Sequence, residues 1–198
     1  MKKIICLLLT MAICFSLVAC VKRINNSTNN LVNDNKTSNI DENNKDVHNK
    51  EITAEELEAQ LATQEIKIIS SKYTVQDEKY KALYPDMLQV VFKNDTQYDI
   101  KNAIIAFVAW DKNNLPVKIK GSIDFSDSAY IRQVNYNDIN LIPGATFGED
   151  SGFKIDETCK ISTFKAIVVS YEAFTGEKWE NPLYNDWCKL YEGVKLSV

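Results

Sequence analysis

The sequence predicts a mainly β protein, an antiparallel β-sandwich with a short N-terminal helix and a C-terminal helix. Many short segments alternate apolar and polar residues, as strands with one buried face do. Asn, Asp and Gly residues separate these segments and supply turns. Helical signals occur only at the two ends of residues 51–198, a stretch of suitable length for a single domain.

The first helix is predicted from Ala54 to Ala62. Thr53 followed three residues later by Glu56 fits a capping box, in which each side chain accepts a hydrogen bond from the other residue's backbone N–H. Leu57 and Leu61 then recur at helical spacing, so one face of the helix is apolar.

The strand signals follow this helix. The segments at 102–110 and 164–174 are apolar at almost every position, which indicates strands covered on both faces. The remaining segments alternate or are interrupted, as strands nearer the edges do. The predicted strands cover residues 66–75, 87–93, 102–110, 115–119, 130–141, 164–174 and 177–179.

The second helix is predicted near the C-terminus. Asn181 suits the N-cap, Pro182 suits the first helical position and Gly193 suits the position after the last turn. Leu183 and Trp187 lie at helical spacing between them and are expected to pack on a sheet.

The N-terminus carries a secretory signal. Lys2 and Lys3 precede an apolar run from Ile4 to Ala19, which is short for a membrane-spanning helix. The run ends in Leu17-Val18-Ala19-Cys20, which resembles the bacterial lipobox. That resemblance implies lipidation of Cys20 and cleavage of residues 1–19. A signal peptide cut elsewhere and an uncleaved anchor are the alternatives.

The stretch that follows is predicted to be a disordered tether covering residues 20–50. Ten of the 30 residues from 21 to 50 are Asn and none is aromatic. Such a segment buries too little apolar surface to offset the entropy of ordering it. A flexible chain of this length spans about 30 Å. The predicted location is therefore the extracytoplasmic face of the cell membrane, with the domain held off the lipid.

Charge and cysteine content restrict the partners. Residues 51–198 carry a net charge of −7, which argues against nucleic acid as a partner. Cys6 and Cys14 leave with the signal, so Cys159 and Cys188 are the thiols of the folded region. They form either a disulfide in an oxidising compartment or two small buried hydrophobic side chains.

Catalytic motifs are missing from the sequence. Its single histidine, His48, lies in the predicted tether, where packing does not hold it beside a nucleophile. No glycine-rich phosphate loop occurs, and no cofactor or metal is expected. Two acidic stretches, 124–127 and 148–152, offer oxygen ligands for Ca²⁺ but lack EF-hand spacing, so solvated turns are the expected reading.

Two stretches carry a family resemblance. Residues 88–119, ending in W-D-K-N-N-L-P-V-K-I, look like the immunoglobulin-like or FxLYD-like modules of Gram-positive lipoproteins. Residues 164–196, with K-A-I-V-V-S-Y-E and W-E-N-P-L-Y-N-D-W, are similar to an uncharacterised domain of secreted Bacillus and Clostridium lipoproteins. The resemblance implies an immunoglobulin-like sandwich and a place outside the cell. It implies no activity.

The expected function is non-enzymatic binding or scaffolding at the cell envelope, with an envelope protein or polymer as partner. Tyr80 and Tyr84 lie in a predicted loop, where aromatic side chains often anchor a partner. The alternative for them is covering an open end of the sandwich. The alternative functions are an envelope polymer-modifying enzyme that uses carboxylates alone and a small-ligand carrier.

Overall fold

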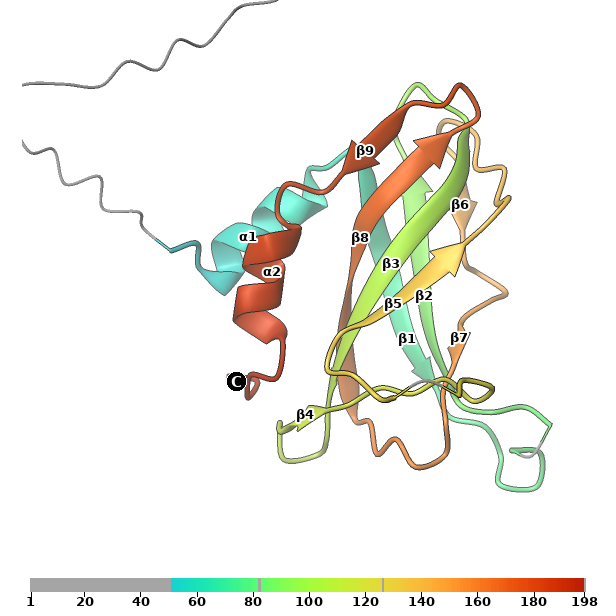
Figure 1. Cartoon of the computed structure of the whole chain (residues 1–198), viewed down its shortest axis with the longest axis vertical. Helices are drawn as coiled ribbons and strands as arrows, with labels where there is room; N and C mark the ends of the chain where they lie inside the picture. The colour runs from blue at the N-terminus through green and yellow to red at the C-terminus, as the bar shows by residue number, and fades with distance from the viewer. Residues whose placement is uncertain (1–50, 82, 126, 198) are drawn as a thin grey trace, which may run out of the picture. The chain divides into compact units, whose positions relative to one another are not determined.

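The computed structural model describes residues 51–81, 83–125 and 127–197 (Figure 1). The predicted signal peptide, the lipidated Cys20 and the predicted tether fall on residues 1–50 and lie outside the described residues. No helix in the described part of the chain is long and apolar enough to cross a membrane.

Two antiparallel sheets form a β-sandwich, as the sequence predicts (Figure 1). In the first sheet β1 pairs with one side of β2, and the short strands β6 and β7 pair with the other side. In the second sheet β3 lies between β8 and the pair β4 and β5, and β9 extends β8. The first sheet comprises β1 (Ile66–Thr74), β2 (Met87–Asn94), β6 (Thr146–Phe147) and β7 (Phe153–Lys154). The second comprises β3 (Ile100–Trp110), β4 (Pro116–Val117), β5 (Arg132–Tyr136), β8 (Thr163–Ala173) and β9 (Lys178–Glu180).

Strand β3 is buried on both faces, which accounts for its nearly continuous apolar sequence. Successive side chains of a strand point to opposite faces of its sheet. Those of β3 therefore enter two separate hydrophobic clusters, one between the sheets and one under the helices. Ala103, Ile105, Phe107 and Ala109 belong to the cluster between the sheets. Ala106, Val108 and Trp110 belong to the cluster under the helices.

Two helices cover part of the outer face of the second sheet (Figure 1). Helix α1 (Ala54–Ala62) has the predicted bounds, and the predicted capping box at its N-terminus is present. Its Leu57 packs beneath α2 (Tyr184–Tyr191) in one hydrophobic cluster. The ends of the described chain are thereby brought onto one face of the sandwich.

A polar cluster joins both helices to the sheet. The Lys165 ammonium of β8 lies 2.5 Å from a carboxylate oxygen of Glu58 on α1. The Tyr191 hydroxyl of α2 donates to the same oxygen at 3.0 Å, and the Lys165 ammonium lies 5.2 Å from the centre of the Tyr191 ring. One carboxylate therefore ties three elements together.

The predicted start of the second helix is wrong by two residues. Helix α2 begins at Tyr184 after the N-cap Leu183, whose side chain makes no capping bond. Asn181 is instead buried in the turn before the helix, where its amide donates to the Val168 carbonyl at 2.7 Å and its oxygen accepts from the Leu183 N–H at 3.0 Å. Gly193 follows the last turn with φ +65°, as predicted.

Candidate functional site

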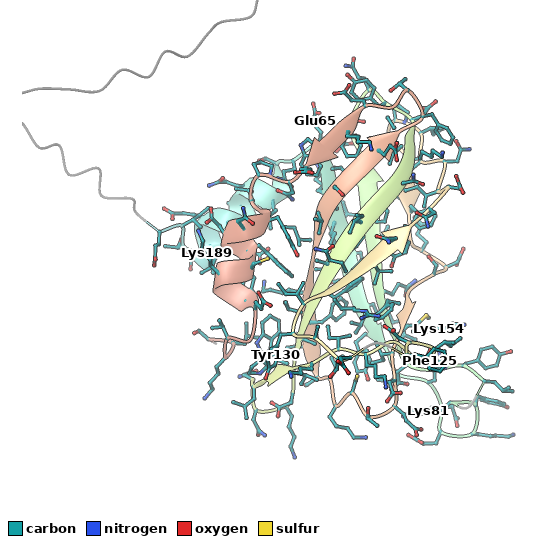
Figure 2. The ribbon with its side chains drawn as sticks, in the orientation of Figure 1. Glu65, Lys81, Phe125, Tyr130, Lys154 and Lys189 are labelled. Carbon is teal, nitrogen blue, oxygen red and sulfur yellow. The ribbon has the colours of Figure 1, made fainter. Side chains whose placement is uncertain are left out.

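Two loops meet at one end of the sandwich, on either side of the segment that contains β7. Ile155 donates its N–H to the Asp86 carbonyl of the first loop at 2.9 Å, and Ser122 of the second loop donates to the Lys154 carbonyl at 3.0 Å. Figure 2 shows Phe125 and Lys154 at this end. We call this surface the loop end; it is formed by the β1–β2 loop, residues 75–86, and the β4–β5 loop, residues 118–131.

Large apolar side chains are exposed on both of these loops. Phe125 is 99% exposed, Ile123 is 83% exposed and Leu83 is 74% exposed. Single exposed apolar side chains are ordinary on protein surfaces, but a group of them on neighbouring loops is a candidate interaction surface. We call this group the apolar tips: Val75, Tyr80, Leu83, Tyr84, Ile123 and Phe125.

The structure places the two aromatic residues selected from the sequence within this group. Tyr80 and Tyr84 are exposed on the β1–β2 loop. Sequence reasoning missed Ile123 and Phe125, because the stretch around them was interpreted as an acidic loop. No local signal marks them as exposed, because residues 119–126, I-K-G-S-I-D-F-S, alternate as a strand with one buried face does.

The base of the β1–β2 loop is held by one carboxylate. Asp86 accepts hydrogen bonds from the Tyr73 hydroxyl at 3.1 Å and from the Gln76 N–H at 2.8 Å. The Lys81 ammonium lies 3.7 Å from the same group. Burial and the Asp86 carboxylate raise the pKa of Tyr73 to about 12. Asp86 therefore holds the base of the loop in place, while side chains farther along it, such as Leu83, are exposed to solvent.

This arrangement predicts a loss of stability at alkaline pH. The folded state holds the Tyr73 proton more tightly than the unfolded chain, in which tyrosine has a pKa near 10.0. Its contribution is complete below pH 10 and is lost as the pH rises through about 12. Tyr73→Phe is expected to show a smaller drop in urea midpoint between pH 9 and pH 11 than the wild type. The exposed Tyr80→Phe serves as the control, and equal drops in all three proteins would contradict this role of Tyr73.

The charge on the loop end is negative. Residues 75–86 and 118–131 together carry four lysines and five carboxylates, a net charge of −1. Lys79 lies over the Tyr80 ring, 5.2 Å from its centre, and Lys81 lies 2.6 Å from the Glu78 carboxylate. The apolar tips are thus bordered by both lysines and carboxylates, with a small excess of carboxylates.

The acidic stretches considered for Ca²⁺ have other contacts. Asp124 forms an ion pair with Arg132. Glu149 accepts a hydrogen bond from the Thr146 hydroxyl at 2.7 Å, and its backbone carbonyl accepts from the Gln89 side chain. In residues 51–81, 83–125 and 127–197 no three metal-ligating side chains come together. These loops are held by protein contacts.

An apolar hollow lies where the two helices meet the C-terminal residues. It encloses about 480 Å³ and is open to solvent. Trp110 and Leu190 contribute apolar walls, and the Glu58–Lys165 ion pair forms its polar side. A small-ligand carrier usually surrounds most of its ligand. The open shape of this hollow does not favour that alternative.

Cys159 and Cys188 are both free and lie in different hydrophobic clusters, so the disulfide alternative is wrong. Cys159 lies between the sheets, where its sulfur accepts from the Lys120 N–H at 3.4 Å. Cys188 lies on α2, on the other side of the second sheet. Burial raises the pKa of both thiols. The alternative of a small buried hydrophobic side chain describes Cys159, whereas Cys188 is partly buried.

Comparison with known proteins supports the fold and identifies a family. A crystal structure of a hypothetical protein from Peptoclostridium difficile 630 superposes with a TM-score of 0.55 and 15% sequence identity, covering 68% of this chain and 94% of that one. At this identity the likeness concerns the fold alone. No curated protein matches the chain. The model of a family of unknown function, DUF5780, matches residues 87–194, more than half of the sequence. The chain therefore belongs to the DUF5780 family.

Proposed function

We propose that the chain is a lipid-anchored extracytoplasmic protein whose domain binds a partner at the cell envelope through the loop end, without catalysis. The observation that carries the proposal is the exposure of the apolar tips on two loops that hydrogen-bond to the same segment, residues 154–155. Burying such side chains against a partner removes apolar area from water and contributes about 1.5–3 kcal/mol for each one fully covered. Aromatic and large aliphatic side chains are the usual anchors of such contacts.

Support for the anchor comes from the sequence. Cys20 follows a charged start and an apolar run of signal-peptide length, in the order of a lipobox. The Asn-rich residues after it suit a flexible connection between lipid and domain. Two or more acyl chains give firm membrane attachment, which one chain alone does not.

Support for binding over catalysis comes from the chemistry available. The one histidine of the sequence precedes the folded domain. About half of the exposed side chains of the loop end are apolar, and its carboxylates Asp86 and Asp124 are already engaged by hydrogen bonds and an ion pair. Such a surface suits recognition by burial.

Capture of a partner from the native envelope tests the loop end. The full chain is used as bait beside a Tyr80→Ala/Tyr84→Ala double variant and a Leu83→Ser/Phe125→Ser double variant. We expect each double variant to recover at least about ten-fold less of the same partner, since 1.4 kcal/mol corresponds to a factor of ten. Phe174→Ser is the matched control, because Phe174 is 54% exposed in the β8–β9 turn. Equal recovery by all baits would exclude the loop end as the docking surface.

Metabolic labelling with a fatty-acid analogue tests the anchor. The wild-type chain is expected to carry the label and to sediment with membranes. Cys20→Ser removes the thiol that would receive the lipid, so its label is expected to be lost and the protein to appear in the soluble fraction. Cys188→Ser is the control, since Cys188 lies within the folded domain and is expected to leave labelling unchanged. Label retained by Cys20→Ser would contradict the anchor.

A further inference from the structure

Strand β5 is an edge strand with one bare side. It pairs with β3 over five residues without any shift in register, and it pairs with no second strand of the described chain. Natural proteins usually protect edges with bulges, prolines or covering elements. The longer edge strand β1 has such protection, because its register shifts between Ile68 and Ser70 and its other side faces β8. Strand β5 has neither a bulge nor a proline.

An apolar groove runs along this bare side, between β5 and β7. It encloses about 450 Å³, and Val134, Tyr136 and Phe153 form its apolar walls. Ile123 of the loop end lies at its rim. The groove therefore borders the side of β5 that pairs with no second strand of the described chain, and it offers apolar surface beside that strand. Both are features that an added strand covers.

The charged groups of the groove do not prevent a second strand from approaching β5. The Arg132 guanidinium lies over the Phe153 ring, 5.7 Å from its centre, and forms an ion pair with Asp124. Its charge is therefore largely neutralised within the wall of the groove. Lys154 is the other charged residue that lines the groove. This patch is consequently not acidic, although residues 51–198 carry a net charge of −7.

We propose that β5 pairs with β5 of a second copy of this chain, in an antiparallel contact with two-fold symmetry centred at Val134. The local charge favours this occupant, because two acidic domains can approach at a patch that is not acidic. A two-fold contact also uses the same patch on both copies, so one self-complementary strand is sufficient. The contact would join the two second sheets into one continuous sheet.

The sequence of β5 suits this register. Opposed residues of an antiparallel pair point to the same face of the sheet, so the symmetric pairing must place a residue opposite its own copy. Centring at Val134 pairs all five residues. Gln133 then lies opposite Asn135 of the second copy on the polar outer face, where their amides can hydrogen-bond. Arg132 lies opposite Tyr136 of the second copy on the inner face.

Register-specific cross-linking in the full chain tests the proposal. In a Cys188→Ser background, Val134→Cys places two thiols directly opposite each other, with Cα atoms about 4.5–5.5 Å apart, within disulfide reach. Gln133→Cys places its two copies about 8 Å apart, beyond that reach. Oxidation of both membrane and soluble fractions is expected to give a dimer band for Val134→Cys and none for Gln133→Cys. Measuring both fractions keeps the outcome independent of the Cys20 anchor.

A second variant tests the same contact in case Val134→Cys disturbs the fold. Gln133→Cys/Asn135→Cys uses two exposed positions of β5 and is expected to restore the dimer band that Gln133→Cys alone lacks. Sedimentation analysis of the wild type is expected to show a dimer that strengthens as salt screens the repulsion between two acidic domains. No band for Val134→Cys or for the double variant, with a monomer at all salt concentrations, would overturn the proposal. A cross-link from these cysteines to a different protein would overturn it equally.

Discussion

Trp110→Ala is expected to lower the free energy of unfolding by about 3–5 kcal/mol, the usual range for deleting a fully buried tryptophan side chain. Trp110 is 1% exposed at the end of β3 and meets the Tyr191 ring edge-on, with centroids 6.0 Å apart. Its indole N–H donates to the Val194 carbonyl at 2.7 Å. The change therefore leaves a cavity beneath α2 and frees the residues that follow the helix.

Urea unfolding followed by circular dichroism measures this loss. Trp179→Ala is the matched control, because Trp179 is only half-buried and stacks on Tyr171 at 5.5 Å between centroids. A smaller loss of about 1–2 kcal/mol is expected there, in proportion to the apolar area removed. A loss for Trp110→Ala no larger than that for Trp179→Ala would show that the helices are not anchored on β3.

Asn94→Ala is expected to cost about 3 kcal/mol, because it leaves several buried polar groups without their partner. Asn94 is fully buried at the end of β2. Its amide donates to the carbonyls of Tyr98 and Leu141 at 2.8 and 2.9 Å. Its oxygen accepts from the N–H and the hydroxyl of Thr96 at 3.0 and 2.7 Å. One side chain thus fixes the turn between the two sheets.

The same urea titration tests Asn94, with Asn113→Ala as the control. Asn113 is exposed in the β3–β4 turn, and its replacement is expected to change stability by less than about 0.5 kcal/mol. Asn94→Asp provides a second comparison, since it keeps the acceptor but removes the two donors. Full stability in Asn94→Ala would mean that water replaces the side chain without cost.

The sequence predicted correctly those elements that depend on residues close to one another in the chain. The capping box at Thr53 and Glu56 determines the start of α1, and the doubly apolar sequence of β3 identifies a strand covered on both sides. Strands β6 and β7 were missed, because each contributes only two residues and both depend on pairing with the distant β2. The long segments predicted at 115–119 and 130–141 likewise shorten to the residues that pair with β3.

Glycine positions show why the segment between β6 and β7 is difficult to predict. Gly148 has φ +106°, and a Cβ atom there would lie 2.0 Å from the Val90 carbonyl oxygen. The backbone therefore passes against β2 where any side chain would collide with it. This requirement comes from a contact across 58 positions of sequence, which a local pattern does not report.

The candidate site was predicted in part for the same reason. Tyr80 and Tyr84 were selected because aromatic residues in a loop are conspicuous in the sequence. Ile123 and Phe125 were passed over, since only the folded structure brings their loop beside the first one through β7. The separation of Cys159 and Cys188 likewise depends on the sheet that lies between them, which the spacing of two cysteines does not reveal.

The free thiols have a practical consequence for handling the protein. Because Cys159 and Cys188 are both free, we expect residues 51–198 to fold without oxidation and to be produced in a reducing cytoplasm. Cys159 is 8% exposed, and burial raises its pKa, so an alkylating reagent reaches a reactive thiolate there mainly when the sandwich opens. The rate of alkylation of Cys159 therefore measures how often the two sheets separate.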